Sequence, residues 1–418
     1  MSGDCDVAVI GAGAAGIAAA RRLVERGLSV IVLEARERVG GRAVTVATDS
    51  GVSVDLGCEW LHSADRNPLT RLAREHELQV IERLPSWGRL RRVHADAATQ
   101  AQWHDASQEF HRRVAAAAAA ADDRPAATLL PPGSRWNALL SAISTWANGV
   151  ELDRLSVQDY ARYADSGINW RIAEGYGTLF VRLAAGLPIH LATPVRHIDS
   201  TGKAVGIETP RGRIRARAAI LTVSTSVLAA EAIRFTPKLP PATLAAAHGL
   251  PLGLANKLFL GLAGAAEDLP ADGFVFGAID RVATGSYNLR SRGRAIVAGY
   301  FGGILARELE AAGPEAMAAF ARDELAGIFG NAIRPRLSLL ASSAWAGDPF
   351  ACGSYSFALP GHAGDRAVLA APLDARLHLA GEACSPHDFS TAHGAFLSGL
   401  EAADAILAER GTPGAPLA

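Results

Sequence analysis

Residues 6–42 read DVAVIGAGAAGIAAARRLVERGLSVIVLEARERVGGR and contain a complete βαβ unit. The β-branched apolar run at residues 7–10 is typical of a buried parallel strand, and an Ala-rich helix is expected to follow it to about Arg26. Gly27 ends that helix, and residues 29–33 form a second predicted strand. This order of elements predicts an α/β fold with a Rossmann-type parallel sheet.

The turn between the first strand and the helix reads GAGAAG over residues 11–16. Gly11 permits the tight turn, Gly13 lets backbone N–H groups approach a pyrophosphate, and Gly16 lets helix and strand pack closely. The N-terminus of the helix adds a partial positive charge for phosphates. Glu34 ends the second strand, where a carboxylate accepts hydrogen bonds from ribose hydroxyls and repels the 2′-phosphate of NADP. The unit therefore predicts a dinucleotide site.

A glycine pair flanked by arginines follows the second strand at residues 38–42. Such a loop lets backbone and guanidinium groups close on a diphosphate. Together with Glu34 it gives the pattern ExxxRxGGR, which resembles the FAD-binding signature of the flavin amine oxidase superfamily. The resemblance implies FAD rather than NAD, and the alternative is a solvated basic loop after a Rossmann strand.

Length and composition favour a two-domain globular protein. The chain has 418 residues, of which 49% are hydrophobic and 20% charged, and this length exceeds what one core usually organises. A net charge of −1 gives no electrostatic case for binding nucleic acid or an anionic membrane. The abundance of Arg and Ala over lysine suggests a GC-rich bacterial genome.

Location and metal content are also suggested by composition. The N-terminus lacks the pattern of a secretory signal, and no apolar run is long enough for a membrane anchor, including the Pro/Gly-rich tail at residues 411–418. The cysteines show neither metal-binding spacing nor a disulfide framework, which favours the reducing cytoplasm and no metal. They are Cys5, Cys58, Cys352 and Cys384.

Changes of character along the chain suggest that an FAD-binding domain is interrupted twice by a substrate domain. Residues 96–123 are predicted to form an amphipathic helix, the chain returns to short strands after residue 175, and a separate strand at residues 219–223 could join the first sheet. The predicted division is FAD-binding segments at 1–70, 171–249 and 347–418, a helical substrate segment at 71–170, and a sheet-forming substrate segment at 250–346.

Four further segments are similar to polyamine oxidases of this family, so the resemblance covers the chain from end to end. These segments are LGCEWLH with NPL (56–62 and 67–69), WAGDPF with GSYS (345–350 and 353–356), GEA (381–383) and STAHGAFLSG (390–399). The resemblance implies a p-hydroxybenzoate-hydroxylase-like FAD domain and a six-stranded substrate domain, hence an α/β FAD domain with a doubly inserted α+β domain. It also implies oxidation of an amine C–N bond at flavin N5, with O2 as acceptor and H2O2 as product.

Five residues are the catalytic candidates. Lys257 lies in an otherwise apolar strand, where burying an ammonium is costly without a partner. The resemblance implies that it holds a water against flavin N5, as the matching lysine of the family does. The alternative is a lysine on an edge strand with its ammonium group in solvent. His62 matches the substrate-side histidine of polyamine oxidases and is able to bind an amine or shuttle a proton. Glu59 either offers its charge to a cationic substrate or pairs with a nearby arginine. Tyr355 matches one wall of the aromatic cage at the flavin, and Thr391 stands where monoamine oxidases have the second.

The residues expected to contact FAD come from all the motifs above. They are Gly11, Gly13, Ala14, Ala15, Gly16, Glu34, Ala35, Arg36, Gly41, Arg42, Gly57, Cys58, Glu59, Trp60, Val195, Trp345, Gly381, Glu382, Thr391 and Ala392. Trp345 is as consistent with core packing as with cofactor contact, and Phe389 is as consistent with core packing as with substrate contact. Ser354 occupies the position where monoamine oxidases carry the cysteine bonded to flavin, which favours non-covalent FAD, although Cys352 is only two residues away.

Five functions remain open at this point. The first is an amine oxidase of the polyamine oxidase kind, with an amine and O2 as its small-molecule partners and a monomer or homodimer as its expected state. An L-amino-acid oxidase would need a pocket arginine, and an aromatic monoamine oxidase is a further enzyme alternative. A phytoene desaturase-like enzyme would have no use for Lys257 and Tyr355, and an FAD-bound protein without catalysis would need interaction domains that the sequence does not show.

Overall fold

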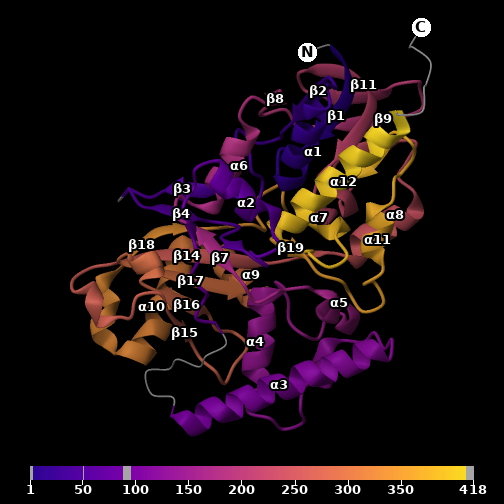
Figure 1. Ribbon diagram of the computed structural model, residues 1–418. Coiled ribbons are helices and arrows are strands. Elements are labelled where there is room, and N and C mark those ends of the chain that lie inside the picture. The colour runs from indigo at the N-terminus through magenta and orange to yellow at the C-terminus, as the bar shows by residue number, and fades with distance from the viewer. Residues whose placement is uncertain (1–2, 50, 88–95, 411–418) are drawn as a thin grey trace.

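The computed structural model describes residues 3–49, 51–87 and 96–410, so the predicted tail at 411–418 lies outside the described residues. Its largest sheet has eight strands, contributed by parts of the chain that are far apart in sequence (Figure 1). These strands are β1 (Gly3–Ile10), β2 (Val30–Leu33), β8 (Ile189–His190), β9 (His197–Asp199), β10 (Val205–Thr209), β11 (Gly212–Leu221), β12 (Arg234–Thr236) and β20 (Leu377–Leu379).

The predicted βαβ unit forms the middle of this sheet. β1 pairs in parallel with β2 on one side and with β11 on the other. β8 extends the sheet in parallel beyond β2, and β20 pairs in parallel with β11. The antiparallel strand β10 connects β11 to β9. The parallel core confirms the predicted Rossmann-type arrangement.

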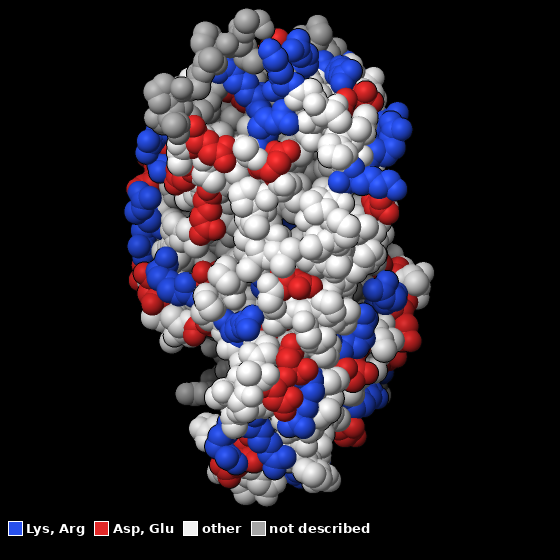
Figure 2. All heavy atoms as spheres, turned by 90° about the vertical axis from the view of Figure 1, so that its right-hand side faces the viewer, with Lys and Arg blue, Asp and Glu red and all other residues white. Residues whose placement is uncertain are grey.

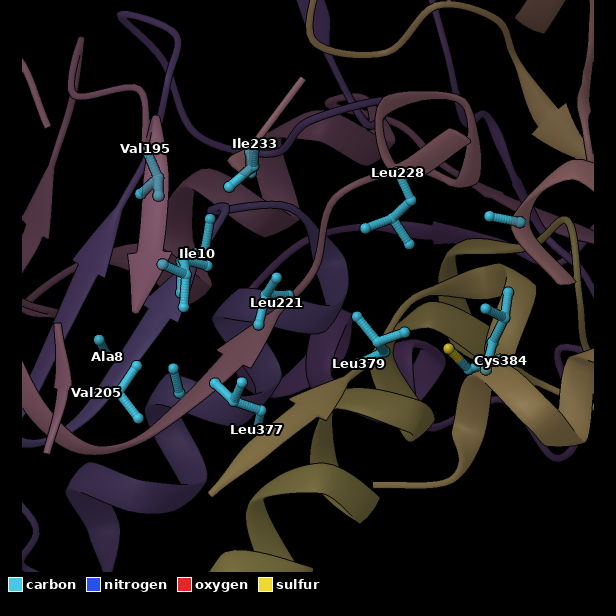
Figure 3. Close-up of a cluster of buried hydrophobic side chains, with 14 of the residues drawn as sticks. Ala8, Ile10, Val195, Val205, Leu221, Leu228, Ile233, Leu377, Leu379 and Cys384 are labelled. Atoms are coloured by element: carbon cyan, nitrogen blue, oxygen red, sulfur yellow. The ribbon is translucent and has the colours of Figure 1, made fainter. Parts of the chain in front are cut away.

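Helices cover both faces of the sheet because successive side chains of a strand point to opposite faces. Val7 and Val9 of β1 pack in a core with α1 (Ala14–Glu25) and α12 (Ala392–Arg410). Ala8 and Ile10 of the same strand belong to the core on the other face, part of which Figure 3 shows. The helices α7 (Thr225–Ala229), α8 (Pro241–Gly249) and α11 (Asp365–Ala370) contribute to that second core.

A second, antiparallel sheet has five strands in the order β15-β16-β17-β14-β18. They are β14 (Ala255–Leu262), β15 (Gly273–Phe276), β16 (Ser286–Leu289), β17 (Ile296–Gly302) and β18 (Leu337–Ser342). The helices α9 (Gly303–Ala312) and α10 (Pro314–Phe329) bury their apolar faces against it. β14, which carries Lys257, has a partner strand on each side and is therefore an interior strand.

A helical layer lies beyond this sheet, at the end of the molecule away from the chain termini (Figure 1). It consists of α3 (Ala97–Ala119), α4 (Asn137–Ala147), α5 (Val157–Arg162) and the 3-10 turn η1 (Ala126–Leu129). Trp103, Phe110 and Val114 share one face of α3 and are buried, as their spacing predicts. They form a core with Phe274 and Phe276 of β15, which joins the helical layer to the five-stranded sheet.

The remaining elements are short. The strands are β3 (Thr45–Ala47) with β4 (Ser53–Asp55), β5 (Trp60–Leu61) with β7 (Trp170–Ile172) and β6 (Val80–Ile81), and β13 (Leu252–Gly253) with β19 (Tyr355–Ser356). The helices are α2 (Pro68–Glu75) and α6 (Tyr176–Ala184), with 3-10 turns η2 (Ala266–Asp268), η3 (Ser291–Gly293), η4 (Asn331–Arg336) and η5 (Glu382–Cys384).

Three expectations about these elements need correction. Residues 219–221 join the first sheet as expected, but as the end of β11 and not as a separate strand, because no glycine or proline interrupts the run; residues 222–223 follow β11. The helix α6 was not predicted, since Gly175, with φ of +99°, and Gly177 resemble a turn. The second sheet has five strands among the described residues, not the six that the resemblance implied. The domain limits themselves stay a prediction.

The surface carries charges of both signs. Figure 2 shows basic and acidic side chains interspersed over most of the face that includes α8, α11 and α12. Among the described residues, no helix combines the length and the apolar character needed to cross a lipid bilayer.

Candidate active site

A large cavity of about 1130 Å³ reaches from the eight-stranded sheet to the five-stranded sheet. Ile10 and Leu33, at the carboxyl ends of β1 and β2, line one end, and Tyr300 of β17 lines another part. Ligand sites commonly measure about 300–1,000 Å³, so this cavity has room for a dinucleotide and a substrate.

Nearly every predicted site residue lines this cavity. Those that do are Gly11, Gly13, Ala14, Ala15, Glu34, Ala35, Arg36, Gly41, Arg42, Gly57, Cys58, Glu59, Trp60, His62, Val195, Lys257, Trp345, Tyr355, Gly381, Glu382, Thr391 and Ala392. Gly16 does not line it. A Cβ on Gly16 would lie 1.9 Å from the carbonyl oxygen of Gly11, so this glycine is needed for the close helix–strand packing that the sequence predicts.

The turn before α1 is shaped for an anionic ligand. Gly13 precedes the helix and provides no side-chain cap, so the first N–H groups of α1 remain directed at the cavity. Gly41 approaches it closely, because a Cβ on Gly41 would lie 3.2 Å from the Cα of Gly13. The two backbones are thus packed together with no side chain on either glycine, so a pyrophosphate in the cavity is able to approach both.

Glu34 is positioned at the same end by backbone N–H groups. Its carboxylate accepts hydrogen bonds from the N–H of Ala12 at 2.7 Å and from the N–H of Arg36 at 2.8 Å. An ionised carboxylate has about four lone-pair positions, so capacity remains for ribose hydroxyls. The guanidinium of Arg36 is bound to Asp348 at 2.7 Å. These residues fit the adenosine end of a flavin dinucleotide.

Arg42 and Glu382 join the segments on either side of the cavity. The guanidinium of Arg42 donates to the carbonyl of Ser354 at 2.6 Å and to Glu382 Oε1 at 2.9 Å. Glu382 also accepts from the hydroxyl of Ser356 at 2.6 Å and from the N–H of Ser390 at 3.1 Å. Burial by itself would raise the pKa of Glu382, but Arg42 and Ser356 outweigh it and hold the pKa below its ordinary value.

The start of α12 also faces the cavity. The hydroxyl of Thr391 accepts from the N–H of Gly394 at 3.0 Å and donates to the carbonyl of Asp388, so Thr391 caps the helix. Thr391 and Ala392 both line the cavity, which brings the positive end of the helix dipole to it. Thr391 therefore caps the helix and faces the cavity at the same time.

Gly57 and Trp345 are packed together at the cavity wall. A Cβ on Gly57 would lie 1.8 Å from the carbonyl oxygen of Arg42, so only glycine fits there. The indole of Trp345 lies against Gly57 and donates from Nε1 to the carbonyl of Leu56 at 3.2 Å. Trp345 belongs to the core of the five-stranded sheet and also lines the cavity.

Lys257 is buried and paired with a carboxylate. Its side chain is 12% exposed, and Nζ donates to Glu59 Oε2 at 2.9 Å and to the carbonyl of Asp55 at 3.2 Å. The alternative of an edge-strand lysine with its head in solvent is therefore wrong. Burial by itself would lower the pKa of Lys257, but the Glu59 carboxylate outweighs this and raises the pKa above its ordinary value.

Glu59 has both of its oxygens directed at cations. Besides Lys257, its Oε1 lies 3.6 Å from the guanidinium of Arg171, so the pairing with an arginine that the sequence left open is present. Burial would raise the pKa of Glu59, yet the neighbouring cations lower it to about 2. The expectation that Glu59 offers its charge to a cationic substrate is not supported, because that charge is already balanced within the protein.

His62 is held in one tautomer by a side-chain amide. Its Nδ1 lies 2.8 Å from Asn169 Oδ1, and Asn169 Nδ2 faces a carboxylate oxygen of Asp165 at 3.3 Å. Because the amide nitrogen faces Asp165, its oxygen accepts from His62 Nδ1–H, and Nε2 keeps the lone pair. Burial lowers the pKa of His62, against a smaller opposing effect of Asp165. The ring is therefore a neutral acceptor at the cavity wall.

Aromatic side chains enclose the part of the cavity near Lys257. The hydroxyl of Tyr355 donates to the carbonyl of Trp146 and lies 3.1 Å from the hydroxyl of Tyr300, which therefore donates to it. Trp146 stacks on Phe276 with ring centroids 5.4 Å apart. Phe389 lines the cavity too and packs under the guanidinium of Arg366 at 3.7 Å, so it is a packing residue, and its contact with substrate stays a prediction.

Ser354 and Cys352 differ in their position relative to the cavity. The hydroxyl of Ser354 donates to the carbonyl of Ala255 at 2.8 Å and accepts from the N–H of the same residue. Cys352 is exposed, and its thiol faces the carbonyl of Pro349. Cys352 is not among the described residues that line the cavity, and no group of three metal-ligating side chains occurs in the described parts of the chain.

Several site residues had escaped the sequence argument. These residues are Arg171 of β7, Asn169 beside β7, and Tyr300 of β17. Strand pairing brings them to the site: Tyr300 lies opposite Lys257, and Arg171 lies opposite Trp60. The pairing register of these strands would have identified the three residues, but a single sequence does not reveal that register.

Comparison with known proteins places these features in context. A family model described as flavin containing amine oxidoreductase matches residues 14–166 and 156–407. The "Lysine-specific histone demethylase 1 homolog 2" of Arabidopsis thaliana is 30% identical over 96% of this chain, and this chain spans only 58% of that protein. "Polyamine oxidase 3" of Oryza sativa subsp. japonica is 29% identical over 95% of this chain and 88% of its own length.

Solved structures show the same fold. Wild-type putrescine oxidase bound to putrescine superposes with a TM-score of 0.82 at 21% sequence identity, over 98% of this chain and 100% of that chain.

Proposed function

The chain belongs to the family of flavin-containing amine oxidoreductases, and on this basis we propose that it oxidises a C–N bond of an amine with FAD as its cofactor. The observation that carries the proposal is the buried Lys257 ammonium, which lies where the dinucleotide cradle meets the aromatic part of the cavity. FAD supplies the redox chemistry when bound: it accepts a hydride from the carbon next to the amine nitrogen, and O2 then takes up the electrons as H2O2.

The residues of the chain hold the cofactor at one end. Gly13, Gly41 and the first turn of α1 accommodate the pyrophosphate, and Glu34 binds the ribose hydroxyls. The N-terminus of α12, at Thr391, faces the cavity and would stabilise negative charge on a flavin ring bound beside it. Ser354 in place of a bonded cysteine supports a non-covalent cofactor.

At the other end the residues prepare the amine. An amine must be deprotonated before its nitrogen lone pair can assist hydride loss, and His62 Nε2 is a neutral acceptor for that proton. Tyr300 and Tyr355 form an apolar wall that excludes water, with their hydroxyls engaged with each other and with the backbone. Lys257 has a third N–H, beyond those used by Glu59 and Asp55, for a water or oxygen at the reacting centre.

We propose a diamine or polyamine, including N-acetylated forms, as the substrate class. The similarity to polyamine oxidase supports this choice. Glu59 is already paired with Lys257 and is not free to bind the substrate. Among the described carboxylates that line the cavity, Asp165 is the one with no cation within ion-pairing distance. Its side chain is exposed, so we propose that it binds the second ammonium group of the substrate.

An aromatic monoamine is the second candidate, because Trp146, Phe276, Tyr300 and Tyr355 all line the cavity. An L-amino acid is less well supported. The arginines among the described lining residues are Arg36, Arg42 and Arg196, and the first two are bound to Asp348 and Glu382.

Release of H2O2 across a panel of amines tests the substrate class. The panel contains spermine, spermidine, putrescine, N-acetylspermine, tyramine and several L-amino acids in one buffer. We expect a diamine or polyamine to have the highest kcat/KM. If tyramine or an amino acid exceeds all of them by about tenfold, roughly 1.4 kcal/mol of transition-state stabilisation, the polyamine assignment is wrong.

We also propose a cytoplasmic location in a bacterium and a monomeric or homodimeric state. The four free cysteines support a reducing compartment. Light scattering of the purified protein tests the oligomeric state.

A further inference from the structure

A buried network of charges surrounds Lys257, and Glu59 is its centre. The side chains of Glu59 and Arg171 are 7% and 4% exposed. The guanidinium of Arg171, which faces Glu59, also forms an ion pair with Asp272 at 2.8 Å. A further ion pair joins Arg292 to Asp55 at 2.8 Å. Cations and carboxylates alternate through the network, so removing one charge leaves its neighbours uncompensated.

The geometry leaves Lys257 a single free donor. An ammonium has three N–H groups, of which one donates to Glu59 Oε2 and one to the carbonyl of Asp55. Lys257 lines the cavity, so the third N–H is available there. A lysine side chain has four rotatable bonds, and the two anchoring hydrogen bonds remove most of that freedom.

We propose that Glu59 is a positioning residue, which fixes the ammonium of Lys257 with one N–H directed into the cavity and keeps it charged at the pH at which amine substrates lose their proton. This inference rests on the proposed function for its catalytic meaning, but the placement and charge of Lys257 are measurable without turnover. In this proposal, Glu59 acts on Lys257 and does not bind the substrate.

The charges that face Lys257 come from several elements. Asp55 (β4) and Glu59 (between β4 and β5) favour the ammonium, as does the Tyr300 hydroxyl of β17 if it ionises. Arg171 of β7 and Arg292 of η3 are the cations that face Glu59, and His62, which also faces Lys257, is neutral. In Glu59→Gln the burial of Lys257 is no longer opposed by its closest carboxylate, and Arg171 becomes an uncompensated cation nearby. The ammonium is then expected to lose its proton at a lower pH.

NMR titration of the lysine side chains tests this directly. The chain contains only Lys203, Lys238 and Lys257, so protein labelled with ¹³C at lysine Cε gives three signals, and Lys257→Met identifies the third. In the wild-type holoenzyme, the Lys257 signal should not titrate between about pH 6 and pH 10, because its pKa lies above the ordinary value. In Glu59→Gln it should titrate within that range.

Two further variants keep the test decisive. Glu324→Gln removes another buried carboxylate, one that binds Thr284 and Tyr287 away from the cavity, and it should leave the Lys257 signal unchanged. Glu59→Asp keeps the charge, so its Lys257 signal should stay non-titrating over the same pH range. A Lys257 signal that titrates identically in wild type, Glu59→Gln and Glu59→Asp would overturn the proposal.

A double-mutant cycle separates positioning from a purely structural role. Glu59→Gln should slow reduction of the bound flavin by about 10- to 100-fold in the wild-type background. In the Lys257→Met background the same substitution should have little further effect, because Glu59 acts through Lys257. Additive losses would contradict the assignment. If no amine reduces the flavin in any variant, the proposed function fails, while the NMR titration still decides the role of Glu59.

Discussion

Two largely enclosed basic side chains, Lys257 and His62, are held in opposite charge states by their neighbours. Burial disfavours the charged form of both. Lys257 faces the Glu59 carboxylate and stays an ammonium, whereas His62 faces the neutral amide of Asn169 and stays uncharged. A fixed cation and a neutral base therefore line one cavity. The cation is suited to hold a water or oxygen at the reacting centre, and the neutral base is suited to accept the proton of the amine.

The role of His62 predicts a particular pH dependence. In His62→Ala, kcat/KM should fall by roughly 100-fold or more near neutral pH, where the substrate is an ammonium ion and needs an acceptor. The loss should shrink as pH rises, because the free amine no longer needs one. The pKa of His62 lies below its ordinary value, so its own protonation should affect only the acidic end of the profile. A loss of equal size at every pH would exclude the role.

The side chain at position 354 predicts how the cofactor is attached. The Ser354 hydroxyl is engaged with Ala255, and Cys352 lies outside the described cavity lining, whereas Cys58 is the thiol among the described residues that line the cavity. Burial raises the pKa of Cys58, so it is a protonated, weakly nucleophilic thiol. Acid denaturation of the yellow protein followed by centrifugation should leave the flavin in the supernatant. Colour that remains in the pellet would show a covalent bond.

At the level of secondary structure, the first βαβ unit depends on the contact between α1 and the turn after β1. In Gly16→Ala the new Cβ would meet the carbonyl oxygen of Gly11, so α1 must shift away from β1. We expect a loss of about 1–3 kcal/mol in the free energy of unfolding, together with weaker FAD binding, because the phosphate-facing turn moves.

A glycine at the other end of the same helix is a matched control. Gly27, unlike Gly16, has a positive φ, of +78°, and a Cβ there meets nothing within 4 Å. Gly27→Ala should destabilise the protein slightly through backbone strain and leave the dissociation constant of FAD unchanged. Thermal unfolding and FAD titration of both variants measure the difference, and equal FAD affinities would contradict the role of Gly16.

The sequence predicted those elements whose signal is local. β1, α1 and β2 follow from apolar periodicity and glycines, and α3 follows from the spacing of Trp103, Phe110 and Val114. The motif residues of the first βαβ unit were found because they follow a recognisable strand or start a helix, whereas those after residue 56 were found through the family resemblance. β16 and β18 were not predicted, because their places depend on pairing with distant strands. The Glu59–Lys257 contact joins residues 198 positions apart and needed the three-dimensional structure.

In the whole molecule, the cavity lies where two sheets with separate cores approach each other. The eight-stranded sheet contributes the dinucleotide-facing turn, and the five-stranded sheet contributes Lys257 and Tyr300. Arg42 and Glu382, from distant parts of the chain, hold the intervening loops together. The site is complete only when both sheets are in place, so FAD and substrate are expected to stabilise the folded chain as a unit.

Anaerobic mixing of the purified yellow protein with an amine is the most direct test of the amine oxidase assignment. We expect spermine, spermidine, putrescine or N-acetylspermine to bleach the flavin absorbance, and admission of O2 to restore it with release of H2O2. Lys257→Met should retain its flavin and bleach or recover about 30- to 1,000-fold more slowly. Absorbance that stays unchanged with every amine and every amino acid of the panel would contradict the account.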